Sequence, residues 1–97
     1  MTAYIVVDIE VTDPAPFERY RAEVPAIIAR FGGRYLIRAN QPETAEGAQF
    51  FKRLTVIEFA SMEAARAFYD SADYAPLKEM RVAASISDLL FVPGYEG

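Results

Sequence analysis

Hydrophobic and polar residues alternate cleanly along the first of four predicted strands, a pattern typical of β-strands that are buried on one face. In the first segment, residues 3–11, Ile5, Val7, Ile9 and Val11 point one way, and Tyr4, Val6, Asp8 and Glu10 the other. The other predicted strands are residues 34–39, a segment that begins near Phe50 and ends at residue 59, and residues 85–92. The part at 53–59 is largely apolar on both faces, so we expect a central strand.

Apolar residues at helical spacing follow the first strand, at Phe17, Tyr20, Val24, Ile27, Ile28 and Phe31. We expect this helix to begin at Pro14, with Asp13 as its cap, and to end at Gly32 and Gly33. Pro25 lies inside it and removes one backbone hydrogen bond. The sequence therefore predicts a kink at Pro25 or two short helices.

A second helical region follows the strand at 53–59. Its first helix opens at Ser61, and a break is expected at residues 71–73. Asp73 is the expected cap of a further helical turn with Tyr74, Leu77 and Met80 on its inner face. The order is βαββαβ, which indicates an α+β fold of the ferredoxin-like type: a four-stranded antiparallel sheet with helices on one face.

The sheet face that the helices leave uncovered predicts self-association. Its apolar residues are Tyr4, Val6, Leu36, Leu54 and Val56, with part of the last strand. A face of four strands measures roughly 500 Å², which is large for apolar surface on a monomer. We therefore expect a homodimer in which two such faces pack together and enclose a small cavity, giving a dimeric α+β barrel.

Charged side chains are predicted to share this face, because they recur at a period of two in three strands. The predicted catalytic residues are Asp8, Arg38 and Glu58, and the predicted substrate-binding residues are Tyr4, Arg34 and Tyr35. In this interpretation Asp8 or Glu58 is a general base with a raised pKa, and Arg38 holds an anionic or enolate-forming substrate. Tyr4 or Tyr35 would donate a proton.

The same charges also have a structural interpretation. If Arg34 or Arg38 lies within ion-pair reach of the carboxylates, these stay ionised and form a network across the sheet or the dimer interface. The protein would then be a non-catalytic dimer or interaction module. The aromatic residues of the helices, Phe17, Tyr20, Phe31, Phe68 and Tyr69, are predicted to belong to the core, whereas Phe50 and Phe51 could line the mouth of the barrel or anchor the loop before the third strand.

The composition of the chain limits the number of domains and the kinds of partner that it can have. The chain has 97 residues, of which 53% are hydrophobic, and fits one domain, residues 1–97. Its formal net charge of -4 argues against binding to nucleic acid or to anionic membranes. The sequence contains no segment that resembles a membrane span or a signal peptide, so it predicts a cytoplasmic protein.

The chain contains no Cys, His or Trp, which excludes thiolate and imidazole chemistry and zinc sites built from Cys or His. The side chains that remain available for catalysis or binding are carboxylates, Arg, Lys, Tyr, Ser and Thr. A hard metal held by oxygen ligands stays open in principle, but no Asp-rich loop with calcium spacing is present, so we predict no metal site. We also predict no cofactor. The expected partners are a second copy of the chain and a small organic or anionic ligand.

Several segments in this order resemble one protein family. They are residues 3–14 (AYIVVDIEVTDP), 32–38 (GGRYLIR), 53–59 (RLTVIEF), 61–65 (SMEAA) and 74–81 (YAPLKEMR). The chain is similar in them to the family known as domain of unknown function 1330. This resemblance implies a dimeric α+β barrel, in a superfamily that also holds antibiotic-biosynthesis monooxygenases, haem-degrading enzymes and muconolactone isomerases, but it implies no reaction. The haem-degrading branch relies on His and Trp, which this chain lacks.

Overall fold

A computed structural model describes residues 1–48 and 51–96 of the chain. The elements are β1 (Ala3–Val11), α1 (Pro14–Arg30), β2 (Arg34–Asn40), β3 (Leu54–Phe59), α2 (Met62–Tyr69), α3 (Ala75–Ala84) and β4 (Ser85–Pro93). The third strand begins at Leu54, later than the sequence predicted, and Phe50 lies outside the described residues. The predicted order of elements is confirmed, including the break that separates α2 from α3.

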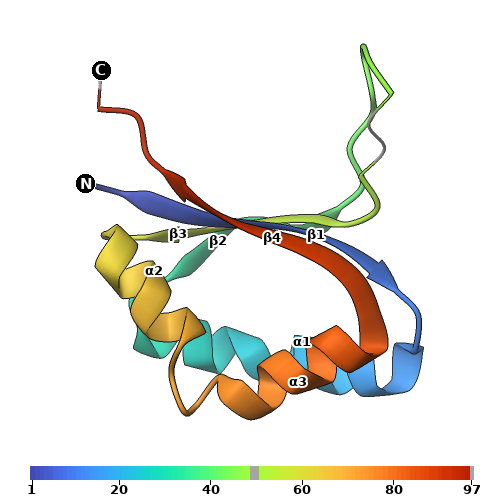
Figure 1. Ribbon diagram of the computed structural model, residues 1–97, viewed down its shortest axis with the longest axis horizontal. Helices are drawn as coiled ribbons and strands as arrows, with labels where there is room; N and C mark the ends of the chain where they lie inside the picture. The colour runs from blue at the N-terminus through green and yellow to red at the C-terminus, as the bar shows by residue number, and fades with distance from the viewer. Residues whose placement is uncertain (49–50, 97) are drawn as a thin grey trace.

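The four strands form one antiparallel sheet in the order β2-β3-β1-β4, so β1 lies between β3 and β4. All three helices cover the same face of the sheet (Figure 1). Residues 41–48 and 51–53, between β2 and β3, and residues 94–96 project from the sheet on the side away from the helices. This is the predicted ferredoxin-like α+β arrangement with one uncovered face.

The core lies between the sheet and the helices. It is built from the inward residues of the strands and the apolar stripes of the helices, with Ile5, Val24, Ile28, Ile57, Phe59, Phe68 and Leu77 among its buried members. Phe59 is fully buried, and its ring stacks on that of Phe68 at 5.6 Å between centroids. Burying one such side chain contributes about 1.5–3 kcal/mol. The predicted packing of the α1 stripe on β1 is therefore confirmed.

Helix α1 runs without interruption through Pro25, so the prediction of two short helices is wrong. Proline at this position has no N–H for the carbonyl of Arg21, four residues earlier. The guanidinium of Arg38 donates to that carbonyl oxygen instead, with Nη2 at 2.7 Å. A side chain from β2 thus replaces the hydrogen bond that proline removes from the helix.

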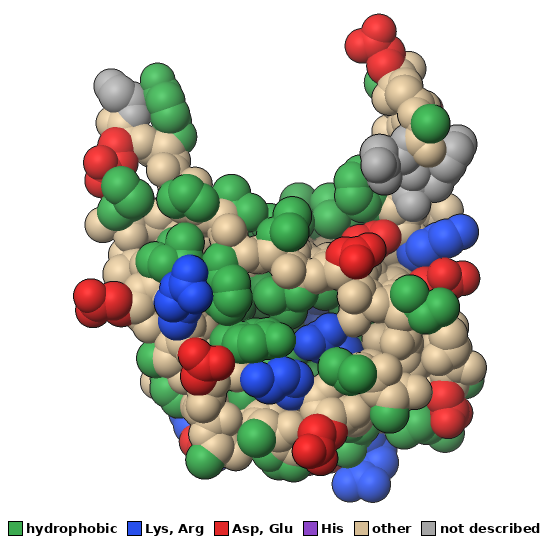
Figure 2. Space-filling model, in the orientation of Figure 1, with side chains coloured by type: hydrophobic (Ala, Val, Ile, Leu, Met, Phe, Trp, Pro, Cys, Tyr) green, Lys and Arg blue, Asp and Glu red, His purple; other side chains and the backbone are tan. Residues whose placement is uncertain are grey.

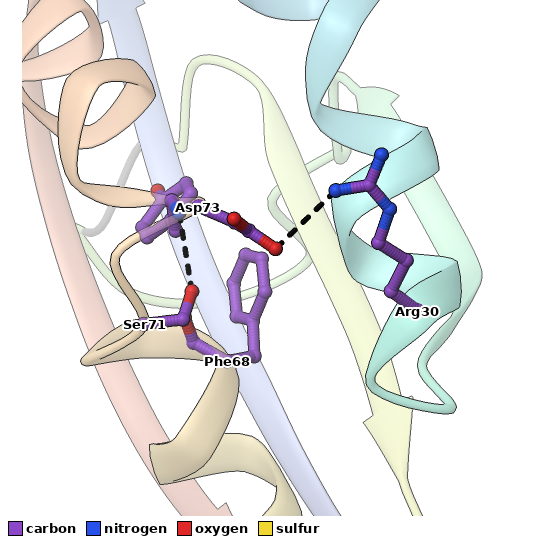
Figure 3. A network of polar contacts seen from close by, with 5 residues as sticks. Arg30, Phe68, Ser71 and Asp73 are labelled. Atoms are coloured by element: carbon purple, nitrogen blue, oxygen red, sulfur yellow. Dashed lines mark hydrogen bonds and ion pairs between the residues drawn. The ribbon is translucent and has the colours of Figure 1, made fainter.

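Neither residue predicted as a helix cap makes a capping hydrogen bond with its side chain. Asp13 occupies the N-cap position of α1, but its side chain makes no capping hydrogen bond. Asp73 does not cap α3: its carboxylate forms an ion pair with Arg30 at 3.3 Å, and Figure 3 shows the two side chains pointing toward each other. The hydroxyl of Ser71 accepts the N–H of Tyr74 instead, at 3.1 Å. A carboxylate that can reach a guanidinium gains a charge-assisted bond there.

The uncovered face exposes large apolar side chains. These include Leu36 and Ile37 on β2 and Ile86 and Leu90 on β4. Val6 lies at the centre of this face, because it pairs with Val56 of β3 on one side and with Leu90 of β4 on the other. We call this surface the open face.

Candidate functional site

Four of the predicted site residues lie on the open face, namely Tyr4, Asp8, Arg34 and Glu58. The contacts that they make there hold the sheet and a loop together. The carboxylate of Glu58 accepts a hydrogen bond from Nε of Arg34 at 2.8 Å, within an ion pair. Oδ1 of Asp8 accepts the backbone N–H groups of Lys52 at 2.8 Å and Arg53 at 3.1 Å, and so holds the end of the loop before β3. Tyr4 shares the face with Glu58, its partner in the neighbouring strand.

Arg38 does not share this face, and the expectation that it would is wrong. Strand β2 pairs with β3 through Arg34 opposite Glu58 and Tyr35 opposite Ile57, but the register then shifts before Ile37 and again before Asn40. Each extra residue in a bulge turns the following side chains to the other face. Arg38 therefore lies on the helix side, where it contacts α1, and its guanidinium stacks over the ring of Tyr35 at 4.9 Å.

A pocket of about 40 Å³ lies between α1 and the sheet at this place. It is lined by Val7, Ile9, Phe17, Tyr20, Arg21, Val24, Tyr35, Arg38, Ala39, Thr55 and Ile57. We call it the interlayer pocket. Of the predicted catalytic residues only Arg38 lines it, because Asp8 and Glu58 lie on the open face.

The backbone beside the interlayer pocket is held in an unusual conformation. Ala39 has a φ of 51°, in the left-handed region that residues other than glycine rarely adopt. Its N–H donates to the buried hydroxyl of Thr55 at 3.0 Å, which helps to fix the second bulge. Such strain persists where the surroundings impose it, and it is common at binding sites. Here it keeps Arg38 turned toward the pocket.

A chain of polar contacts extends from the interlayer pocket through the interior. The hydroxyl of Tyr20, which lines the pocket, lies 3.1 Å from the hydroxyl of Tyr74. Nε of Arg81 donates to that same Tyr74 oxygen at 3.3 Å, and Nη1 of Arg81 donates to the hydroxyl of Ser87 at 2.5 Å. Residues of α1, α3 and β4 are thereby linked across the layer between helices and sheet.

Arg81 is the least expected member of this chain. Its side chain is only 3% exposed. The ion pairs among the described residues join Arg19 to Glu23, Arg30 to Asp73 and Arg34 to Glu58, so none of them neutralises Arg81. A buried charge without an opposite charge costs several kcal/mol of stability.

Sequence reasoning assigned no role to Arg81 and placed Tyr20 in the core. A signal for Arg81 was present nevertheless. Tyr74, Leu77, Arg81 and Ala84 are buried and lie at spacings of three and four residues, so Arg81 occupies an apolar stripe. An arginine in such a stripe is buried when the helix packs, which marks it as unusual.

Burial keeps the phenols of this site protonated. It raises the pKa of Tyr20 strongly, and the neighbouring Tyr74 adds to the effect. Burial also raises the pKa of Tyr35, although the charge of Arg38 opposes it. For Arg81 burial alone would lower the pKa, but the phenolic oxygens of Tyr74 and Tyr20 raise it. The site therefore offers hydrogen-bond donors and a positive charge, and it holds no general base.

The shift at Tyr20 predicts a dependence of stability on alkaline pH. A tyrosine in the unfolded chain loses its proton near pH 10, whereas native Tyr20 keeps its proton to higher pH. The native state then binds more protons, so the free energy of unfolding should fall above pH 10, by up to about 1.4 kcal/mol per pH unit for this group. Tyr20→Phe should make the fall shallower in urea titrations between pH 8 and 11. Tyr95→Phe, at a ring that is 96% exposed, is the control and should leave the slope unchanged.

Within residues 1–48 and 51–96, no group of three or more Asp, Glu, His or Cys residues could hold a metal ion. None of the helices formed by these residues is long and apolar enough to cross a membrane.

Comparison with solved structures shows the same fold in other proteins. A protein of unknown function from Rhodopseudomonas palustris matches with a TM-score of 0.79 at 14% identity, over 99% of this chain and 84% of that chain. SnoaB, a cofactor-independent oxygenase from Streptomyces nogalater, matches with a TM-score of 0.64 at 18% identity, over 99% and 95%. A dimeric ferredoxin-like protein of unknown function from Jannaschia sp. matches with a TM-score of 0.65 at 14% identity, over 97% and 100%.

A comparison with curated proteins found no match. The family description "Domain of unknown function (DUF1330)" matches residues 2–95, which is nearly the whole chain. The resemblance inferred from the sequence is thereby confirmed. The chain belongs to the DUF1330 family and has the ferredoxin-like fold.

Proposed function

We propose that this protein binds a small organic molecule in the interlayer pocket, as a small-molecule-binding protein or a cofactor-free enzyme. The observation that carries the proposal is the buried Arg81, which has no ion pair among the described residues and reaches the pocket through Tyr74 and Tyr20. A protein that needed only stability could fill this position with an apolar side chain. Its retention fits a role in binding.

The pocket walls favour a particular ligand chemistry. Val7, Val24 and Ile57 supply apolar surface, while Tyr20, Tyr35 and Arg38 bring donors. The ligand would therefore have an apolar body and an acceptor oxygen that is partly or fully negative, such as a carbonyl, an enolate or a phenolate. As an enzyme, the protein would stabilise the negative charge on a substrate oxygen, as buried donors do in other enzymes. The oxygenase activity of the similarly folded SnoaB supports this possibility by analogy of fold alone.

The binding proposal predicts a specific pattern of losses. Acetylacetone, a small enolisable diketone, should shift the methyl NMR signals of Val24 and Ile57. Arg38→Gln and Tyr20→Phe should each raise its dissociation constant about tenfold, the effect of losing one good hydrogen bond in a partly buried site. Arg34→Gln, which changes a guanidinium on the opposite face of the same strand, should leave the constant unchanged. No shift with acetylacetone, or equal losses in all three variants, would contradict the proposal.

We also propose that two copies associate through the open face. Exposed apolar side chains on β2 and β4 and the two segments that project beside the face support this contact (Figure 1). The similarly folded protein from Jannaschia sp. is dimeric, which adds support. Asp8, Glu58, Arg34 and Tyr4 would then lie between the two sheets.

For Asp8 and Glu58 a structural role is the second candidate. The ion pair of Glu58 and the loop contacts of Asp8 favour it over a role as general base. In that case the charges of the open face stabilise the sheet and the dimer without catalysis. We propose the cytoplasm, the compartment that the sequence predicts, as the place where the protein meets its ligand.

A further inference from the structure

We propose that a second site, the hollow between β4 and the helices α2 and α3, binds a small planar organic anion such as an aromatic carboxylate. The face of the molecule drawn in Figure 2 is hollowed here, with hydrophobic side chains at the bottom and Lys and Arg side chains in and around it. We call it the β4 hollow and define it by Arg66, Tyr69, Lys78, Arg81 and Phe91. The interlayer pocket has a separate lining that includes none of these five residues, and Arg81 connects with it only through Tyr74 and Tyr20.

The residues of the β4 hollow form one continuous cluster of cations and rings. The rings of Tyr69 and Phe91 meet edge to face, 5.4 Å apart between centroids. Nζ of Lys78 lies 3.9 Å from the centroid of Tyr69, and the guanidinium of Arg66 lies 4.9 Å from that of Phe91. Both cations are therefore held around the same pair of rings.

Arg81 extends this cluster toward the interior. Lys78 also lies 6.0 Å from the ring of Tyr74, whose hydroxyl accepts a hydrogen bond from Arg81. Ser87, from the neighbouring strand β4, accepts a second hydrogen bond from Arg81. The positive charge thus continues from the exposed guanidinium of Arg66 to the buried one of Arg81.

The cations of the β4 hollow are free of ion pairs among the described residues, although Figure 2 also shows Asp and Glu side chains near its rim. The chain has 14 acidic and 10 basic residues, so most cations could find a carboxylate. Nevertheless, Arg66, Lys78 and Arg81 take part in none of the ion pairs among the described residues, which use three other arginines. Three like charges around a partly dry hollow attract an anion more strongly than they would in open water.

The shape and the rings narrow the class of anion. The half-buried rings of Tyr69 and Phe91 add apolar surface beside the cations, which suits a flat apolar body. A guanidinium can also stack on a ligand ring while its edge pairs with a carboxylate. A nucleic acid would need many more cations than these three, in a chain whose net charge is -4. A small aromatic carboxylate combines the flat apolar body with the single negative charge that the site requires.

Benzoate is the probe that tests this site, followed by NMR on the intact protein. Benzoate should shift the signals of Tyr69 and Phe91. The double variant Arg66→Gln/Lys78→Gln should weaken binding at least about tenfold, because it removes two charge-assisted contacts. Neutral benzyl alcohol and ringless acetate should each bind at least about tenfold more weakly than benzoate to the unchanged protein.

The double variant Arg19→Gln/Lys52→Gln is the matched control, since it removes the same two charges from other parts of the surface. It should bind benzoate within about twofold of the unchanged protein. Equal weakening in both double variants, or shifts confined to Val24 and Ile57 of the interlayer pocket, would overturn the proposal. So would acetate binding as tightly as benzoate. Loss of acetylacetone binding in the interlayer pocket would leave it intact, which separates the two proposals.

Discussion

Arg81→Met should leave the free energy of unfolding unchanged or raise it by about 1–4 kcal/mol, although the residue is almost fully buried. Methionine keeps most of the side-chain volume and removes a charge that no carboxylate balances within the described residues. The hydroxyl of Tyr74 would still have Tyr20 as a partner. Urea denaturation at pH 7 gives the comparison. The same variant should lose binding of benzoate and weaken that of acetylacetone.

Arg81→Ala is the companion variant. It removes the charge as well but leaves a cavity, so it should lower the free energy of unfolding by roughly 2–5 kcal/mol. The difference in the free energy of unfolding between the two variants separates the effect of side-chain volume from the effect of the charge. A methionine variant that lost as much stability as the alanine variant would show that the guanidinium itself holds Tyr74 and Ser87 in place. Arg81 would then be a structural residue.

Val6→Lys should convert the dimer proposed here into a monomer and raise its dissociation constant at least about 100-fold. Val6 lies between Val56 and Leu90 at the centre of the open face, and Leu90 is 59% exposed. Two partners packed through this face would bring two unpaired ammonium groups into a dry interface, which costs several kcal/mol. In the isolated subunit the new side chain reaches water, so the fold should persist. Light scattering coupled to gel filtration measures the change in mass.

Val82→Lys is the matched control, because Val82 lies on α3 and is 61% exposed, on the helical layer. It should remain a dimer. If the unchanged protein is a monomer even at high concentration, or if both variants dissociate alike, the open face is not the contact between subunits. Binding of acetylacetone in the interlayer pocket can be measured on the monomeric variant and should persist.

The elements of the fold could be predicted because each depends on residues that are close in the chain. Alternation in residues 3–11 predicted β1, and the spacing of Phe17, Val24 and Ile28 predicted the buried stripe of α1. The helix caps were harder to predict, because a side chain that could cap a helix can also bind another partner in the folded chain. Asp73 can cap a helix in isolation, but Arg30 is far away in sequence and takes its carboxylate.

The candidate site was only partly predictable for the same reason. Tyr35 and Arg38 were selected from the sequence and do line the interlayer pocket, whereas Asp8 and Glu58 lie on the opposite face of the sheet. Tyr20 was assigned to the core, and its hydroxyl gained significance only when Tyr74 came within hydrogen-bond distance.

By itself, the sequence determined the order of strands and helices, the single uncovered sheet face and the family. Local spacing carries that information. Only the tertiary structure decided which face each side chain of β2 occupies, because two register shifts against β3 turn Arg38 toward α1. There its guanidinium bonds the carbonyl of Arg21 that Pro25 leaves without a partner. Both the pairing of strands and the hydrogen bond to this free carbonyl join residues that are distant in the sequence. A periodic pattern of residues does not encode such contacts.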